Sequence, residues 1–220
     1  MIKTKNLIKT FIDGEKETHV LKGIDFEAKE GEFIAIMGRS GAGKSTLLYQ
    51  ISLLDEPTSG EIIIDGVDVH NMSVDQKTSF RLNRLGYVFQ DYALLPDLTA
   101  LENVALPLLM QGKNKVDAYN EATLSLEKVN LGHRINNLPS QLSGGEQQRV
   151  SISRAIAHKP KILFADEPTA NLDNASSATV MEIFKDLNNQ GQTIIMVTHE
   201  EMYAKIADRL IRLDDGRIVT

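Results

Sequence analysis

Cysteine is absent from this sequence of 220 residues. Disulfide bonds, thiolate chemistry and cysteine-ligated zinc are therefore excluded, whereas metal sites built from histidine or carboxylate side chains stay open. The absence also favours a cytosolic protein, because disulfides belong to oxidising compartments.

Long apolar segments are missing as well. The longest apolar runs, such as Val104–Met110, are far shorter than the roughly 20 residues of a membrane-spanning helix. The start of the chain, Met1–Lys5, is not followed by the apolar stretch of a signal peptide. We therefore expect no direct insertion into a membrane, and any membrane association should come through another protein.

The sequence has no large excess of one charge. With 24 basic and 30 acidic residues its net charge is −6, which gives no overall attraction to nucleic acid or anionic lipid. Long heptad arrays, low-complexity tracts and internal repeats are also absent. The 42% of hydrophobic residues can bury a sizeable core, so one compact domain without a nucleic-acid partner is expected.

Short apolar runs alternate with helix-like segments. Phe33–Met37, Ile162–Ala165 and Thr193–Val197 are apolar on both faces, as buried parallel strands are. Helical patterns lie between them, most clearly at 44–54 and 176–189. The alternation predicts an α/β fold with a mainly parallel core sheet.

Two other regions depart from this alternation. Ile2–Ile8 and His19–Phe26 read as strands of an antiparallel edge region. Residues 91–158 hold no comparable strand and read as mostly helical. We therefore predict a single domain, whose α/β core with its β edge comprises 1–90 and 159–220, and whose helical subdomain is inserted at about 91–158.

A glycine-rich segment follows the first buried run and matches G-x-x-x-x-G-K-[ST]. An accidental glycine-rich turn is the alternative, but the position between strand and helix favours a phosphate-binding loop (P-loop). Its N–H groups and the following helix N-terminus would surround phosphates. Lys44 would reach the β- and γ-phosphates of ATP, and Ser45 would ligate Mg²⁺. The predicted ATP-binding residues here are Gly38, Arg39, Ser40, Gly41, Ala42, Gly43, Lys44, Ser45 and Thr46.

A second buried run ends in two adjacent acids, Asp166 and Glu167. Adjacent side chains at a strand end point in different directions, so Asp166 can hold Mg²⁺ while Glu167 orients and polarises the attacking water. Pro168 is expected to bias Glu167 toward an extended backbone. A solvated acidic loop is the alternative interpretation.

The string Asp-Glu-Pro-Thr also occurs at Asp55–Thr58. A helix that begins at Lys44 would place this copy about 15 Å away at 1.5 Å per residue. The residues before it, Leu47–Leu54, continue a helix and do not form a strand. We therefore interpret Asp55–Gly60 as a surface turn without a catalytic role.

The third motif is Leu142–Arg149, in which Ser143 and Glu146 have the spacing of a capping box at a helix start. Alone, it could be an ordinary helix cap. Together with the P-loop and the paired acids it resembles the signature of the ATP-binding cassette (ABC) transporter ATPases, over essentially the whole chain. The resemblance implies the ABC variant of the P-loop NTPase fold, ATP hydrolysis with Mg²⁺, and a head-to-tail homodimer around two ATP. In it Ser143, Gly144 and Gly145 would contact the ATP of the other protomer, where an exposed helix N-terminus suits an anion.

Further residues match this family in order. Gln90 resembles the Q-loop glutamine that senses Mg²⁺, and Asp173 resembles the D-loop aspartate that approaches the partner's P-loop, although it could also cap the next helix. His199 resembles the switch histidine at the γ-phosphate, although a capping box at Thr198–Glu201 could make it structural. Phe11 stands where the family usually stacks a tyrosine on adenine, although it could pack beneath the edge sheet. The resemblance thus implies Glu167, His199, Gln90 and Lys44 as catalytic residues and Ser45, Gln90 and Asp166 as metal ligands.

Leu98–Val104, Leu106–Leu108 and Pro139–Gln141 resemble the branch of macrolide exporters and lipoprotein-release systems, with MacB-like, LolD-like and FtsE-like cassettes. The implied partner is an integral-membrane permease, whose coupling helix would enter a groove lined by residues 90–96. The cassette would then be cytoplasmic and peripheral on the inner face of the membrane. A mechanotransmitting, FtsE-like role without transport stays open as the alternative.

Other classes of ATPase that share the signature fit less well. A DNA-repair or chromosome-structure ATPase needs a long coiled coil between P-loop and signature, and the interval here is short. A translation factor would carry two cassettes in one chain. A nucleotide sensor without catalysis would be expected to lack the acid at Glu167.

Overall fold

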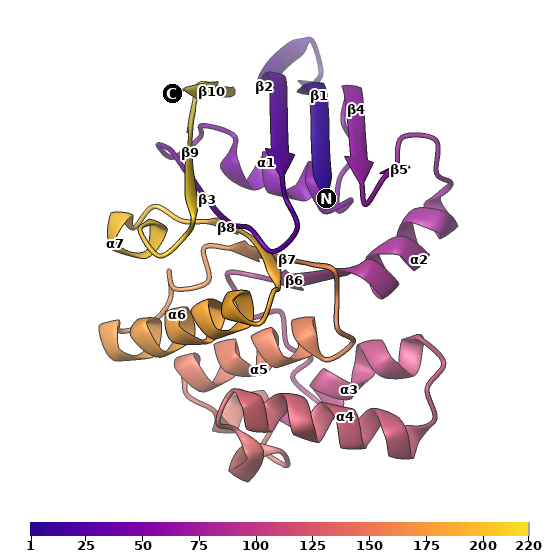
Figure 1. Ribbon diagram of the computed structural model, residues 1–220, viewed down its shortest axis with the longest axis vertical. Helices are drawn as coiled ribbons and strands as arrows, with labels where there is room; N and C mark the ends of the chain where they lie inside the picture. Colours follow the sequence, from indigo (N-terminus) through magenta and orange to yellow (C-terminus); the bar gives the residue numbers. More distant parts are fainter. Residues whose placement is uncertain (220) are drawn as a thin grey trace. The chain divides into compact units, whose positions relative to one another are not determined.

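The computed structural model describes residues 1–219. The chain divides into two compact units (Figure 1). The first consists of Met1–Arg81 together with the segment from Gly191 onward, and the second is Leu82–Gln190. None of the helices within residues 1–219 is long and apolar enough to cross a membrane.

The first unit contains an antiparallel sheet in the order β2-β1-β4-β5. The hairpin of β1 and β2 turns at Gly14, which has a φ of +60° that glycine adopts without strain. Alternate side chains such as Ile24, Phe26 and Ala28 are buried, as in a sheet with one covered face. The strands are β1 (Ile2–Asp13), β2 (Lys16–Ala28), β4 (Ser59–Ile64) and β5 (Val67–Asp68).

The first unit also contains strands in the order β10-β9-β3-β8. β3 (Phe33–Met37) pairs in parallel with both β8 (Thr193–Val197) and β9 (Arg209–Asp214), and β10 (Arg217–Val219) is antiparallel to β9. Every residue of β3 and β8 is buried, so these two strands have the bounds that their apolar runs predict.

Short helices complete this part of the chain. α1 (Lys44–Ile51) is the next element after β3 and buries Leu47, Leu48 and Ile51. α7 (Glu201–Ala204) follows β8. α2 (Val74–Arg84) buries none of its residues and leads from the first unit into the second.

The second unit combines a parallel strand pair with helices. β6 (Leu85–Val88) pairs in register with β7 (Ile162–Asp166). A side chain caps each of the longer helices: Thr99, Asn114, Ser143 and Asp173 accept hydrogen bonds from backbone N–H groups two or three positions into the helix. These helices are α3 (Ala100–Met110), α4 (Lys115–Lys128), α5 (Gly144–Ile156) and α6 (Asn174–Asn189), with short 3₁₀ turns at Gly132–Arg134 and Pro139–Gln141.

The described residues 91–158 form helices and no strand. Together with the parallel pairs and the antiparallel sheet, this confirms the predicted fold class: an α/β protein with parallel strands, an antiparallel β region and a helical insertion.

Candidate nucleotide site

The predicted P-loop connects β3 to α1 in the first unit. At Gly38 an added Cβ would lie 2.1 Å from the carbonyl oxygen of Leu213, so only glycine lets the loop pass strand β9. Gly43 precedes α1 with a φ of +98°, a conformation that favours glycine. These two constraints explain the glycines at either end of the motif.

The side chain of Lys44 points into this loop. Its side chain is buried, and Nζ donates hydrogen bonds to the carbonyl oxygens of Gly38, at 3.0 Å, and Arg39, at 3.1 Å. The ammonium group therefore lies inside the loop, at the N-terminus of α1, where the helix dipole also favours an anion. Arg39, Ser40 and Gly41 are exposed, and the buried Ala42 accepts a hydrogen bond from Gly216 N–H.

His199 lies at the same strand edge as the P-loop. β3 and β8 are parallel neighbours with Ile36 opposite Val197, so the segments that follow both strands leave from one edge. His199 is exposed there. The expected capping box is not formed: Thr198 accepts a hydrogen bond from Glu200 N–H, and α7 begins after Glu200 without a side-chain cap. α7 is only four residues long and has Glu200 as its N-cap, so Thr198 is not in the capping position.

Phe11 lies at the end of β1 with 47% of its surface exposed. The Nζ of Lys9 is 4.9 Å from the centre of its ring, a cation–π distance. The ring is therefore not packed in a core beneath the sheet. An exposed aromatic face can stack on a base, and adenine stacking by Phe11 stays a prediction.

The paired acids and Gln90 lie in the second unit, at one edge of the β6–β7 pair. Asp166 is the last residue of β7 and is 5% exposed, whereas Glu167 follows it and is partly exposed. Gln90 comes two residues after the end of β6. Because the two strands are parallel and in register, their carboxyl ends bring Gln90 and the two acids to the same edge, where ligands of α/β sheets bind.

Glu167 does not have the extended backbone expected from Pro168. Its φ is +44°, in the left-handed region that non-glycine residues rarely adopt. A turn immediately after β7 imposes this conformation, because Ala170 N–H donates to the Glu167 carbonyl oxygen at 3.1 Å. Strained backbone of this kind concentrates at functional sites, where the surrounding structure holds it.

The signature segment opens α5 with a complete capping box. Ser143 Oγ accepts from Glu146 N–H, and Ser143 N–H donates to the Glu146 carboxylate at 2.8 Å. This backbone hydrogen bond lowers the pKa of Glu146, and Arg134 Nε, 3.0 Å from the same carboxylate, lowers it further. At Gly145 an added Cβ would lie 2.6 Å from Ser176 Oγ, so α5 can approach α6 only with glycine there.

A cavity of about 190 Å³ lies beside this helix start. Its lining contains the hydroxyls of Ser143 and Ser176 and the guanidinium of Arg149. A helix N-terminus, hydroxyls and a cation suit a phosphate. Asp173 is the N-cap of α6, as expected, and the hydrogen bonds from Ser176 N–H and Oγ lower its pKa.

Three further residues of the second unit, which are not among the predicted site residues, make contacts with the expected site segments. Asn171 Nδ2 donates to the carbonyl oxygen of Gln90 at 3.2 Å, which connects the expected D-loop with the Q-loop. Arg154 of α5 donates to the carbonyl oxygens of Tyr92 and Ala93, and its burial lowers its pKa. Gln148 of α5 donates to the carbonyl oxygen of Pro168. Only the position of Gln148 within the signature could have drawn attention to it.

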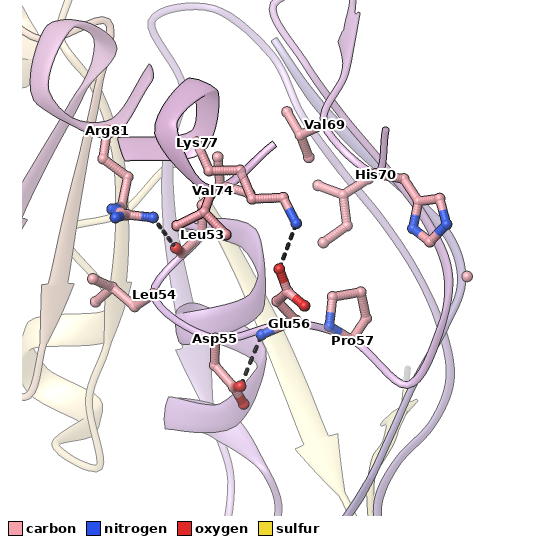
Figure 2. Close-up of a pocket in the computed structure, with 12 residues that line it drawn as sticks. Leu53, Leu54, Asp55, Glu56, Pro57, Val69, His70, Val74, Lys77 and Arg81 are labelled. Carbon is pink, nitrogen blue, oxygen red and sulfur yellow. Dashed lines mark hydrogen bonds and ion pairs between the residues drawn. The ribbon is translucent and has the colours of Figure 1, made fainter. Parts of the chain in front are cut away.

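The second acidic pair lies in different surroundings, at a cavity of about 240 Å³ between the end of α1, β4 and α2 (Figure 2). α1 ends at Ile51, and Asp55 and Glu56 lie in the irregular segment before β4. Glu56 pairs with Lys77 of α2 at 2.6 Å, and this hydrogen bond lowers its pKa. Asp55 pairs with Lys9 at 2.8 Å. The carboxylates thus lie in a loop with surface ion pairs, as predicted. The predicted bounds are wrong at both ends, because α1 already ends at Ile51 and not at Leu54, and Ser59 and Gly60 belong to β4 and not to the turn.

The predicted site residues are divided between the two units. The first unit holds the P-loop, His199 and Phe11. The second holds Gln90, Asp166, Glu167, the signature residues and Asp173.

Comparison with known proteins supports one interpretation of these groups. A family model described as ABC transporter matches residues 21–170. The LolD ATP-binding protein of the lipoprotein-releasing system of Aquifex aeolicus is 47% identical over 200 residues, which are 91% of this chain and 89% of LolD. The macrolide export ATP-binding/permease protein MacB of Campylobacter fetus is 45% identical over all of this chain, which spans 34% of MacB.

Solved structures agree with the sequence relatives. The ATP-binding cassette MJ0796, in a dimeric post-hydrolysis state bound to ADP and Pi, superposes with a TM-score of 0.93 at 42% identity, covering 100% of this chain and 97% of that one. The chain belongs to the ABC transporter family and carries its ATP-binding, ATP-hydrolysing domain. The resemblance drawn from the three motifs is thereby confirmed.

Proposed function

We propose that the chain hydrolyses ATP held between its P-loop and the signature segment of a second copy, and thereby drives a separate membrane permease of the lipoprotein-release or macrolide-export type. The observation that carries this proposal is the loop around Lys44, whose ammonium group already lies among carbonyl oxygens inside the P-loop. A β/γ-phosphate would provide it with a stronger partner than two neutral carbonyls. The named relatives, LolD and MacB, supply the type of permease.

Each group of residues takes a separate role in this proposal. Glu167 accepts the proton of the attacking water, and His199 and Lys44 bind the γ-phosphate. Ser143 and Gly145 bind the γ-phosphate of the ATP on the partner, with Asp173 near the partner's P-loop. Phe11 stacks on adenine. In the proposed organisation of the chain, residues 1–90 and 159–220 form the α/β core, and residues from about 91 to 158 form the helical subdomain.

Three of the predicted site residues also carry oxygen atoms that can ligate Mg²⁺. Ser45, Gln90 and Asp166 offer hydroxyl, amide and carboxylate oxygens, the ligands Mg²⁺ prefers. Within residues 1–219 no group of three or more histidine, cysteine or acidic side chains could hold a metal. Mg²⁺ in nucleotide sites takes most of its ligands from phosphates and water, so it needs few ligands from the protein. Bound Mg²⁺ would neutralise phosphate charge.

The proposed permease places the cassette on the cytoplasmic face of the membrane, and the segment 90–96 would receive the permease. Leu95 is 44% exposed in this segment, which suits a protein partner.

The test of the nucleotide site is Lys44→Ala. ATP turnover should fall below detection and ATP affinity should drop at least tenfold, because no other side-chain cation of the motif reaches the phosphates. Turnover would be followed by phosphate release and affinity by isothermal titration. Lys77→Ala, which removes a lysine paired with Glu56 in the same unit, is the matched control and should behave as wild type. Wild-type turnover in Lys44→Ala would contradict the proposal.

A further inference from the structure

Gln148 is an amide buried in the middle of the signature helix α5. Its exposed fraction is 0%, and its Nε2 donates to the carbonyl oxygen of Pro168 at 2.8 Å. Its Oε1 has no hydrogen-bond partner among the described residues. A buried amide that is only half satisfied destabilises the fold relative to an apolar side chain of similar size. The one hydrogen bond it makes therefore identifies what this side chain contributes.

That hydrogen bond fixes the residue next to Glu167. Proline has no N–H, so its carbonyl oxygen is the only backbone group through which Pro168 can be held. Pro168 is buried, and Glu167 before it has a φ of +44°. The turn is closed on its other side by Ala170 N–H, which donates to the Glu167 carbonyl oxygen. Gln148 thus supplies a contact from outside the turn, next to the strained backbone of Glu167.

We infer that Gln148 is a positioning residue for Glu167: it holds the turn after β7 so that the Glu167 carboxylate faces the attacking water. This inference rests on the proposed function, in which Glu167 is the base. The helix that carries Gln148 begins with Ser143 and Gly145. One helix therefore connects the contact with the partner's ATP to the base that acts on the chain's own ATP.

The test is Gln148→Met, which keeps an unbranched side chain of similar volume and removes the donor. Misplacing a catalytic group by about 1 Å can lower a rate about 100-fold. We expect kcat for ATP to fall 10- to 100-fold with little change in KM, because the nucleotide contacts remain. Since the γ-phosphate then persists, the variant should also accumulate an ATP-dependent dimer in light scattering, which a general loss of structure would not produce.

Ser151→Ala is the matched control. Ser151 lies one turn further along α5, is also 0% exposed, and its Oγ likewise has no partner among the described residues. It should keep wild-type kcat. Gln148→Asn, whose amide is one methylene too short to reach Pro168, provides a second variant should Gln148→Met fail to fold. In a Glu167→Gln background, Gln148→Met should lower turnover no further, since both changes act on the same step.

The outcomes separate the inference from the function on which it rests. Absence of ATP turnover in the wild type would contradict the proposed function. Normal turnover in the wild type together with normal kcat in Gln148→Met would overturn the positioning role alone. Loss of both turnover and ATP-dependent dimer in a folded Gln148→Met or Gln148→Asn protein would also overturn it, because the damage would then extend beyond the base.

Discussion

The dipeptide Asp-Glu followed by Pro occurs twice in this chain, once at Asp55 and once at Asp166, and the two copies differ in their surroundings. Glu167 follows a buried strand and lies in a strained turn, whereas Glu56 lies in a surface loop and pairs with Lys77. The hydrogen bond from Lys77 lowers the pKa of Glu56, so this carboxylate is a weaker base and is already bound to an ammonium group. Local sequence alone cannot separate the two acids, but the element that precedes each can.

The first prediction at the scale of single residues compares these two acids. Glu167→Gln should reduce ATP turnover at least 100-fold, because an amide cannot accept the proton of the attacking water. Glu56→Gln should keep turnover within a factor of two, since only a surface ion pair is weakened. Both rates would be measured by phosphate release at saturating ATP. Equal losses at the two positions would show that the assignment of the base is wrong.

The backbone of Glu167 marks the limit of prediction from the sequence at this scale. Pro168 was expected to favour an extended Glu167, because proline disfavours helical backbone in the residue before it. The observed φ of +44° goes with two hydrogen bonds: Ala170 N–H donates to the Glu167 carbonyl oxygen, and Gln148 Nε2 donates to the carbonyl oxygen of the next residue, Pro168. Gln148 is 20 residues from Pro168 in the sequence. A local rule cannot anticipate a contact at that distance.

Strands were predictable where their burial is complete. β3 and β8 have the predicted bounds because both faces of these strands are covered and the sequence is apolar throughout. β1 and β2 extend beyond the prediction, because backbone pairing continues to Asp13 and Lys16 through exposed side chains. α2 was not predicted, since it buries none of its residues and carries few apolar side chains.

Helix starts were predictable from capping residues. Ser143 and Glu146 form the expected capping box on α5, and Asp173 caps α6. The box expected at Thr198–Glu201 is absent, because α7 is only four residues long and begins after Glu200. A capping pattern therefore has predictive value only where enough helix follows to need it.

The prediction at the scale of elements concerns the pH dependence of the α5 cap. The pKa of Glu146 is lowered from 4.5 in the folded protein, first by the hydrogen bond from Ser143 N–H. Its contribution to stability is therefore present above pH 4.5 and is lost as the pH falls through the lower, folded pKa. Glu146→Ala should destabilise the protein by about 1 kcal/mol at pH 7 and by less at pH 3. Denaturant titrations of both proteins at the two pH values would measure this.

The control variant for Glu146→Ala is Glu121→Ala. Glu121 pairs with Lys113 at 2.5 Å in the same unit but caps no helix. As a surface pair it should contribute roughly 0–1 kcal/mol. A loss of stability in Glu146→Ala that stays constant from pH 7 to pH 3 would rule out the carboxylate as the group responsible.

At the scale of the whole molecule, the site residues are distributed over two compact units. The P-loop and His199 belong to one unit, and the paired acids and signature residues to the other. The cavity beside Ser143 is lined by residues of the second unit alone. In the proposed function a phosphate of the partner's ATP occupies this cavity, and the ATP-binding cassette MJ0796 is dimeric in a post-hydrolysis state bound to ADP and Pi. Assembly and catalysis should therefore be linked through ATP.

The final prediction follows from that link. Glu167→Gln keeps ATP binding and removes the base, so the γ-phosphate should persist and hold two copies together. ATP stabilises the state that binds it better, and the dimer offers each ATP the additional contacts of Ser143, Gly145 and a helix N-terminus. ADP lacks the phosphate that these groups bind. Light scattering after gel filtration should therefore report a dimer with ATP and a monomer with ADP.

Adding Ser143→Arg to Glu167→Gln tests the position of the interface. The exposed Ser143 lines the cavity beside α5, where an arginine side chain would fill the space for the phosphate. Dimerisation with ATP should be lost while ATP binding to the P-loop, measured by titration, is kept. Ala175→Ser, a small change at the rim of the same cavity, should leave the dimer intact. If Glu167→Gln binds ATP yet stays monomeric at high protein concentration, or if Ser143→Arg leaves its dimer unchanged, ATP does not lie between the P-loop of one chain and the signature of the next.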